Sequence, residues 1–387
     1  MTSPDSSSPL LAAFENQDEV FASAFSILLE AIAERAFPGA SIAITHRGRT
    51  VALKALGHFT YKAGAPSFSQ SLAEDGDFAS EVRPSTLFDL ASLTKVVATT
   101  PMAMLLYERG LLDLDAPVGA VVPEFISDAG KDPRRRDVTL RMLLAHSSGL
   151  PAYEKLFLKT PTHDELLHAA FTTPLTADPG TRDEYSDIGF IILGIALDRL
   201  GDESLDRFCQ REVFSPLAMT STTFNPPLEI RKQIPPTCED RSFRNRIIQG
   251  EVQDENASVL GGVAAHAGLF STAGDLATFA HCMLNGGNPI LRPETVSLFT
   301  RRESAPTATS RALGWDTPSS PSQSGRYFSP QSFGHLGYTG NSLWIDPARR
   351  LSIALLTNRT WPDCSNQAIK QVRPRFHDAI IEALNLV

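Results

Sequence analysis

The placement of alternating apolar runs constrains the fold of this chain more than any other feature. Two such runs, residues 40–46 and 50–57, flank a short polar loop near the N-terminus, and two more, 341–346 and 351–358, lie near the C-terminus. Each pair is typical of a β-hairpin, because alternation gives each strand one face for a core and one for solvent. Both ends of the chain would then contribute strands to one sheet, and the residues between them would form an insertion.

Helical periodicity dominates the rest of the chain. Apolar residues recur at helical spacing over residues 20–36 and again over 369–380, next to the two predicted hairpins. Further helical patterns lie between them, at residues 92–110, 139–145, 164–171, 188–200, 205–213 and 275–285. We therefore predict an α/β (α+β) fold. Its sheet domain is built from residues 18–92 and 305–387, and a mainly helical subdomain, 93–304, is inserted into it.

Composition limits the partners of the chain. Lys and Arg number 35 against 44 Asp and Glu, a net charge of −9, so we expect neither nucleic acid nor an anionic membrane surface as a partner. No run approaches the roughly 18 apolar residues that span a bilayer. The polar N-terminus lacks the basic and apolar regions of a secretory signal, which favours a cytoplasmic location. The four cysteines form no C-x-x-C pair and are expected to be buried thiols.

The first motif with chemical meaning is Ser92-Leu93-Thr94-Lys95, an S-x-x-K at the start of a predicted helix. Residues three apart share a helix face, so Ser92 Oγ and Lys95 Nζ can meet. A serine hydroxyl needs a base to become a nucleophile, and a buried lysine loses its proton more readily than an exposed one. The same four residues also fit a helix cap followed by an exposed lysine, and the motif alone leaves both interpretations open.

The second motif is Tyr185-Ser186-Asp187. A tyrosine near ammonium groups can take part in proton transfer, although a tyrosine at a helix entrance capped by Ser186 or Asp187 fits the same residues. The third motif, Gly334 to Gly340, contains His335, Gly337 and Tyr338 directly before an apolar strand. Its glycines would allow close approach of a substrate, and its free N–H groups would suit an oxyanion hole. A glycine-rich bend with a structural histidine remains the alternative.

Other hydrolase signatures are absent from the sequence. There is no G-x-S-x-G nucleophile elbow and no G-x-x-x-x-G-K-[ST] phosphate loop. His163 and His168 are five residues apart rather than the four of H-E-x-x-H, so no zinc site is predicted. His146, at the end of a predicted helix, is interpreted as a structural residue.

Taken together, the motifs resemble the β-lactamase/penicillin-binding-protein superfamily of serine hydrolases. The order S-x-x-K, Y-x-N-like and K-T-G-like is that of class C β-lactamases, DD-peptidases and family VIII carboxylesterases. In this chain the three motifs read Ser92-Leu93-Thr94-Lys95, Tyr185-Ser186-Asp187 and His335-Leu336-Gly337. Residues 88–91, 144–151, 261–272 and 342–347 are also similar to the family, so the resemblance covers roughly residues 20–385.

The resemblance implies a five-stranded antiparallel sheet flanked by helices, with an all-helical subdomain beside it and the active site between them. It also implies that Ser92 attacks a carbonyl to form an acyl-enzyme while Lys95 and Tyr185 transfer protons. The backbone N–H groups of Ser92 and Tyr338 would form the oxyanion hole. His335, Gly337 and Asp187 would complete the substrate-binding set, and neither a metal nor an organic cofactor is expected.

Two positions depart from the family pattern. His335 replaces the lysine associated with recognition of a substrate carboxylate, which argues against penicillins as the main substrates. Asp187 replaces an asparagine, so a hydrogen-bond donor becomes an acceptor-only carboxylate that would also raise the pKa of Lys95. These departures favour a carboxylesterase acting on small acyl esters, with weak or no β-lactamase activity.

Three alternatives remain open. The chain would also suit an amidase or D-amino-acid peptidase acting on cell-wall-type fragments, or a β-lactamase. A non-catalytic sensor that kept the fold is disfavoured by the intact Ser92, Lys95 and Tyr185. A small-molecule ester or amide is therefore the expected partner, and no pattern in the sequence indicates the oligomeric state.

Overall fold

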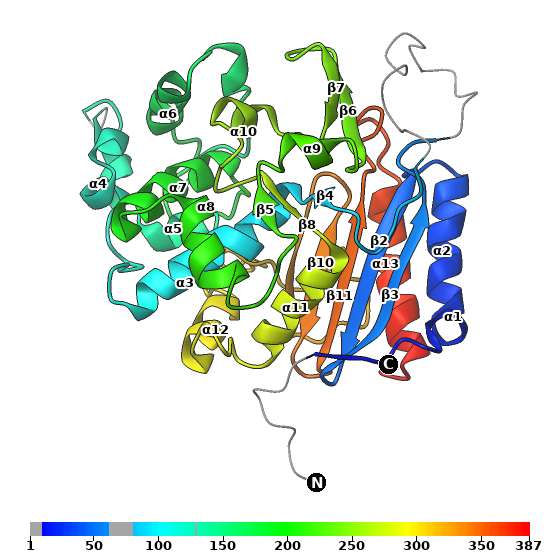
Figure 1. Cartoon of the computed structure of the whole chain (residues 1–387). Coiled ribbons are helices and arrows are strands. Elements are labelled where there is room, and N and C mark those ends of the chain that lie inside the picture. Colours follow the sequence, from blue (N-terminus) through cyan, green and yellow to red (C-terminus); the bar gives the residue numbers. More distant parts are fainter. Residues whose placement is uncertain (1–9, 62–79, 128–129) are drawn as a thin grey trace.

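The computed structural model describes residues 10–61, 80–127 and 130–387. Its central element is a six-stranded sheet in the order β1-β3-β2-β11-β10-β9 (Figure 1). The strands are β1 (Leu11–Ala12), β2 (Gly39–His46), β3 (Arg49–Gly57), β9 (Phe333–Leu336), β10 (Ser342–Asp346) and β11 (Leu351–Thr357). Strand β11 pairs antiparallel with β2 over its whole length, which joins the C-terminal hairpin to the N-terminal one. The sheet is therefore built from both ends of the chain, as the alternating runs predicted.

The sheet differs from the expected five antiparallel strands at its edge. The short strand β1 pairs with β3 in a parallel orientation, with Leu11 opposite Arg49. This sixth strand escapes sequence reasoning because two residues cannot show an alternating pattern. The other five strands pair antiparallel, and the β-lactamase-like α+β class predicted for the chain is confirmed.

Helices cover both faces of the sheet. On one face lie α1 (Gln17–Val20), α2 (Ala22–Ala33) and α13 (Ile369–Ala383), and on the other lies α11 (Ala273–Leu284) (Figure 1). The α2–α13 side holds a core that includes Phe25, Leu28, Trp344, Phe376 and Ile380. The second core runs from the other side of the sheet into the helical region. Helix α11 belongs by sequence to the predicted insertion 93–304 but packs on the sheet, so the boundaries given above remain a proposal.

The remaining elements lie mainly beside the sheet (Figure 1). The α-helices are α3 (Thr100–Glu108), α4 (Val118–Val121), α5 (Leu140–Leu144), α6 (His163–Thr172), α7 (Asp187–Gly201), α8 (Leu205–Cys209), α9 (Leu228–Arg231), α10 (Glu255–Val259) and α12 (Pro293–Thr300). Short 3₁₀ segments are Ala91–Leu93, Pro123–Ile126, Pro133–Asp137 and Leu156–Leu158, and π-helical segments are Lys95–Thr99 and Gln210–Phe214. A small sheet contains β4 (Phe88–Asp89), β8 (Leu269–Ser271) and β5 (Thr223–Phe224), and β6 (Pro236–Asp240) pairs with β7 (Arg246–Gln249).

The helix predicted over residues 92–110 is not continuous. Ser92 lies in a 3₁₀ turn, a π-helical segment follows, and the α-helix α3 begins at Thr100. Pro101 explains the position of this change, because proline lacks an N–H and is tolerated only in the first turn of an α-helix. The predicted helix 205–213 is likewise divided, into α8 and the π-helical segment that follows it.

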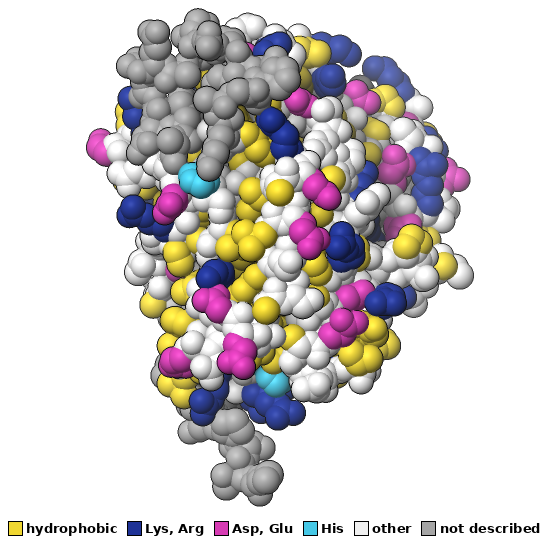
Figure 2. All heavy atoms as spheres, turned by 90° about the vertical axis from the view of Figure 1, so that its right-hand side faces the viewer, with side chains coloured by type: hydrophobic (Ala, Val, Ile, Leu, Met, Phe, Trp, Pro, Cys, Tyr) yellow, Lys and Arg dark blue, Asp and Glu magenta, His cyan; other side chains and the backbone are white. Residues whose placement is uncertain are grey.

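The surface carries mixed charge on the face that Figure 2 shows. Lys and Arg side chains lie among Asp and Glu there, and no large area of one sign is visible (Figure 2). Within the described residues, no helix combines the length and the apolar character that crossing a bilayer requires. Residues 61–84 are polar and lack periodicity, which predicts a surface loop, but most of them lie outside the described residues.

Candidate active site

Side chains from two separate motifs meet at the hydroxyl of Ser92. Lys95 Nζ lies 3.0 Å from Ser92 Oγ, and Tyr185 Oη lies 2.6 Å from the same oxygen. Ser92 follows the short strand β4, whereas Tyr185 comes from the loop before α7. Both side chains are partly exposed, so the hydroxyl is open to a small molecule. The arrangement joins a nucleophile, an amine and a phenol within hydrogen-bond distance.

A buried carboxylate holds the turn that carries Ser92. Asp89 Oδ1 accepts the N–H of Ala91 at 2.8 Å, and Asp89 Oδ2 accepts that of Gln253 at 2.7 Å. Ala91 has a φ of +47°, a left-handed conformation that is unusual for a residue with a Cβ. Burial raises the pKa of Asp89 to about 6, although its two backbone hydrogen bonds act in the opposite direction. Asp89 therefore stabilises the strained turn immediately before the serine.

Lys95 is fully buried and surrounded by acceptors. Its ammonium donates to Ser92 Oγ, to Asp187 Oδ1 at 2.6 Å and to the backbone oxygen of His266 at 2.9 Å. Each of the three N–H donors of the ammonium thus has an acceptor. Burial lowers the pKa of Lys95, and the negative charge of Asp187 opposes that effect. The predicted attraction between Asp187 and Lys95 is therefore present as a direct ion pair.

A second carboxylate lies behind the lysine. Asp254 caps the N-terminus of α10 by accepting the N–H of Ala257, and its Oδ1 lies 2.9 Å from Nε2 of His266. Its negative charge also raises the pKa of Lys95. Sequence reasoning noted residues 261–272 as family-like but gave His266 no role, and it missed Asp254. Neither residue belongs to a motif whose spacing would reveal a contact with the distant lysine.

The backbone and ring of His146 hold Tyr185 in place. The His146 carbonyl accepts the N–H of Glu184 at 2.8 Å, and its Nδ1 accepts that of Ser186 at 3.0 Å. The imidazole also packs against the phenol, with 4.6 Å between ring centroids. Burial raises the pKa of Tyr185 well above its ordinary value, so Tyr185 donates to Ser92 as a neutral phenol in the resting state.

The third motif lies on the edge strand β9 and in the turn that follows it. His335 is buried, and its ring centroid is 5.8 Å from that of Tyr185. Burial, followed by the positive charges of Lys95 and Arg311, lowers the pKa of His335 to about 3, so this imidazole is neutral at pH 7. His335 therefore carries no charge where the family pattern has a lysine.

Gly337 and Tyr338 place the turn after β9 against the serine. A Cβ on Gly337 would lie 2.6 Å from the carbonyl oxygen of Leu90, so only glycine permits this approach. The side chain of Tyr338 is about half exposed and stacks on the Arg359 guanidinium, 4.5 Å from the ring centroid. Its backbone N–H meets no acceptor within the described part of the chain. All of the residues singled out from the sequence therefore belong to one region.

Arg311 is a member of the site that sequence reasoning missed. Its guanidinium carbon is 5.6 Å from the Tyr185 ring centroid, and its buried Nε has no hydrogen-bond partner among the described residues. Arg311 Nη1 lies 3.8 Å from Oδ1 of Asp316, at the limit of an ion pair. Arg311 lies in a stretch without a readable motif, and no signal in the sequence assigns it to the site. The region around Ser92 nevertheless contains a cation beyond Lys95.

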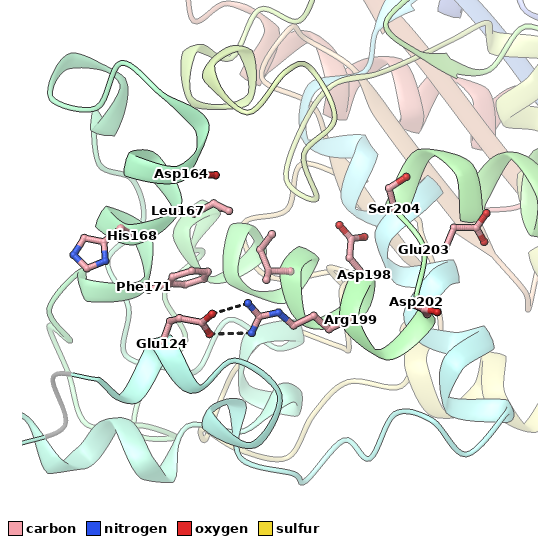
Figure 3. A pocket seen from close by; sticks show the side chains of 11 residues that line it. Glu124, Asp164, Leu167, His168, Phe171, Asp198, Arg199, Asp202, Glu203 and Ser204 are labelled. Atoms are coloured by element: carbon pink, nitrogen blue, oxygen red, sulfur yellow. Dashed lines mark hydrogen bonds and ion pairs between the residues drawn. The ribbon is translucent and has the colours of Figure 1, made fainter.

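A separate surface pocket lies in the helical region (Figure 3). Glu124 and Arg199 form a two-point ion pair there, with nitrogen–oxygen distances of 2.7 and 2.9 Å, and the carboxyl of Asp198 lies nearby. The hydroxyl of Ser204 in the lining donates to the Asp206 carboxylate at 2.6 Å, an acid rather than an amine or imidazole. Among residues 10–61, 80–127 and 130–387, no cluster of three or more His, Cys, Asp or Glu side chains is arranged to hold a metal ion. Ser92 and its neighbours remain the candidate site.

Comparison with curated proteins finds relatives that align with most of this chain. An N-acetylmuramyl-L-alanine amidase of Bacillus subtilis is 32% identical, over 84% of this chain and 77% of the relative. A putative D-alanyl-D-alanine carboxypeptidase of Escherichia coli K12 is 34% identical, over 71% of this chain and 69% of the relative.

Solved structures share the fold at lower sequence identity. EstCE1, described as a hydrolase with promiscuous acyltransferase activity, has a TM-score of 0.74 at 19% identity, over 94% of this chain and 99% of EstCE1. A class C beta-lactamase from Rhodobacter sphaeroides has a TM-score of 0.69 at 22% identity, over 95% and 99% of the two chains. The model of the family described as Beta-lactamase matches residues 22–372. The chain therefore belongs to the beta-lactamase family of serine hydrolases.

Proposed function

We propose that this protein hydrolyses small acyl esters through an acyl-enzyme formed on Ser92. The observation that carries the proposal is the meeting of Lys95 Nζ and Tyr185 Oη at Ser92 Oγ, at 3.0 and 2.6 Å. A hydroxyl that contacts both an amine and a phenol has a proton acceptor and a proton donor in reach, which is what acyl transfer requires.

The proposed reaction has two balanced halves. In acylation, neutral Lys95 takes the Ser92 proton while Oγ bonds to the carbonyl carbon, and Tyr185 gives its proton to the departing alcohol. Lys95 then returns a proton to Tyr185, which leaves both groups neutral. In deacylation, the same groups activate a water that attacks the acyl carbon and releases Ser92 with its proton restored. The burial that lowers the pKa of Lys95 supports its role as the acceptor.

The developing oxyanion would bind two backbone N–H groups, those of Ser92 and Tyr338. The N–H of Tyr338 has no acceptor among the residues that the structure describes, which supports this assignment, as does the close approach of Gly337 to Leu90, next to the serine turn. Preorganised backbone donors of this kind are a main source of stabilisation in acyl transfer.

Two features favour esters over β-lactams. Asp187 is engaged with Lys95 and offers only acceptor oxygens, so it cannot donate to the amide carbonyl of a lactam side chain. His335 is neutral and cannot attract a substrate carboxylate by charge. An ester with a small neutral acyl group requires neither contact.

A second candidate is hydrolysis of an amide in a cell-wall-type fragment. Arg311 favours it, because this cation with an unpartnered Nε lies beside Tyr185 and would attract a carboxylate. The names of the curated relatives agree with that chemistry. The ratio of kcat/KM for a D-alanyl-D-alanine peptide to that for a nitrophenyl ester distinguishes the two candidates.

The test of the proposed nucleophile is Ser92→Ala, assayed with a short-chain nitrophenyl ester. Serine nucleophiles contribute on the order of 10⁴-fold or more to kcat, so the variant should lose at least that much. Ser26→Ala, an exposed serine on α2, is the matched control and should keep wild-type activity. Unchanged turnover in Ser92→Ala would refute the nucleophile assignment.

A further inference from the structure

Helix α13 contains a buried cation, Arg373. Arg373 is 5% exposed, and no carboxylate within the described residues forms an ion pair with it. Burial, and then the charge of Arg359, lower the pKa of Arg373 to about 9, so it remains positive at pH 7. A buried charge is costly unless hydrogen bonds compensate for it. Its location therefore calls for an explanation beyond packing.

The guanidinium of Arg373 binds the turn that follows β9. Nη2 donates to the carbonyl oxygen of Gly337 at 3.0 Å, and Nε donates to that of Gly340 at 3.1 Å. The two carbonyls between them are also occupied: Arg359 Nε donates to the oxygen of Tyr338 at 2.8 Å, and Arg359 N to that of Thr339 at 2.9 Å. Two arginines thus fix every carbonyl of residues 337–340.

The first of these contacts determines the direction of one N–H group. The carbonyl of Gly337 and the N–H of Tyr338 belong to the same planar trans peptide unit, so they point in opposite directions. Holding the Gly337 oxygen toward Arg373 therefore turns the Tyr338 N–H away from α13. That N–H, like the N–H of Thr339, has no acceptor among the described residues.

We propose that Arg373 is a positioning residue that orients and polarises the Gly337–Tyr338 peptide as an oxyanion donor. The inference rests on the proposed acyl transfer at Ser92. A cation bonded to a carbonyl oxygen draws electron density from its peptide group and strengthens the N–H at the other end as a donor. The effect would grow as negative charge develops on the substrate oxygen, so it would act on the transition state more than on substrate binding.

The hydrogen bonds around the turn make this peptide rigid enough for such a role. Gly340 N donates back to the Gly337 oxygen at 3.0 Å, and Thr339 Oγ1 donates to the carbonyl of Asp89 at 2.8 Å. The second bond ties the turn to the strand that leads into Ser92. The two proposed oxyanion donors are therefore held relative to each other, and Arg373 supports one of them from outside the site.

The test compares Arg373→Met with Arg375→Met, an exposed arginine on the same helix. Loss of one oxyanion donor lowers kcat by roughly 10²–10³-fold. Its misorientation in Arg373→Met should lower kcat for a nitrophenyl ester at least about tenfold, with KM changed much less. The affinity for phenylboronic acid should fall in parallel. Ser92 Oγ bonds to boron while the serine proton passes to Lys95, and the resulting tetrahedral adduct places one of its oxygens in the proposed oxyanion hole. Circular dichroism and thermal unfolding establish that both variants fold.

Equal kcat in the two variants, or a change confined to KM, would overturn the inference. If Arg373→Met does not fold, Arg373→Lys decides, because lysine keeps the charge but lacks the planar fork. Reduced kcat and reduced boronate affinity in that variant support the inference, and wild-type values for both overturn it. If wild-type protein neither hydrolyses the ester nor binds the boronate at Ser92, the proposed function fails and the inference with it. If it does both and Arg373→Met matches Arg375→Met, only the inference fails.

Discussion

Replacing Asp187 by Asn should move the pH dependence of catalysis in a defined direction. In the wild-type protein the Asp187 carboxylate lies 2.6 Å from the fully buried Nζ of Lys95, and its charge raises the pKa of that amine against the larger effect of burial. The substitution keeps the shape of the side chain but removes the charge. The pKa of Lys95 should therefore fall, and the neutral amine required for acylation should form at lower pH.

The size of the effect follows from the distance. Two unit charges at 2.6 Å attract by roughly 6 kcal/mol at an effective dielectric constant of about 20. The loss of this attraction in Asp187→Asn is partly offset, because the Asp254 charge and the other two acceptors of Lys95 still stabilise the ammonium. Opposite charges at close range typically move a titration by about 1–3 pH units. The ascending limb of the kcat/KM profile should thus move to lower pH by about one pH unit or more.

The assay is hydrolysis of a short-chain nitrophenyl ester measured across the acidic to alkaline range. Asp178→Asn, an exposed carboxylate paired with Arg134, is the matched control and should leave the profile in place. Asp187→Asn should also raise lactam hydrolysis relative to ester hydrolysis, since an amide can donate to a lactam side chain. An ascending limb that stays in place or moves to higher pH would refute the reasoning about Lys95.

Three further substitutions test Lys95, Gly337 and Asp198. Lys95→Ala should slow acylation by roughly 10²–10⁴-fold, while the unfolding temperature stays near that of the wild type. Collapse of the fold in this variant would instead show that Lys95 is a structural residue. Gly337→Ala should lower kcat/KM by about tenfold or more, because the new Cβ would lie 2.6 Å from the Leu90 oxygen and displace the turn. Wild-type kinetics in this variant would show that the close contact between Gly337 and Leu90 is unimportant for catalysis. Burial raises the pKa of Asp198, a residue of the pocket in Figure 3, to about 7. The folded state therefore binds more protons than the unfolded state between pH 3.8 and about 7. The free energy of unfolding falls as the pH rises through that window. Asp198→Asn should therefore raise the unfolding temperature above about pH 7 more than at acidic pH, and a gain independent of pH would contradict this.

The sequence predicted the contacts that depend on local spacing. Ser92 and Lys95 meet because residues three apart share a helix face, even though the segment is 3₁₀ and π-helical rather than a regular α-helix. The hairpins at the two ends were readable because alternation has a period of two. Both patterns are local, so one sequence suffices to recognise them.

Contacts made across long stretches of chain were not readable in the same way. Arg311 reaches the site from an irregular segment, and Asp254 reaches the surroundings of Lys95 from the cap of the short helix α10. Their side chains lie near the lysine because of tertiary packing, which leaves no periodic mark in the sequence. Tyr185 could be linked to Ser92 only through the order of motifs in a family, and not by its own spacing.

The central claim is that a covalent acyl group forms on Ser92, and one measurement tests it directly. The protein is incubated with an activated ester, quenched in acid, digested and mapped by mass spectrometry. We expect a mass increase equal to the acyl group on the peptide that contains Ser92, absent from Ser92→Ala. An acyl group on a different residue, or turnover in the wild type without any acylated Ser92 under rapid quenching, would contradict it.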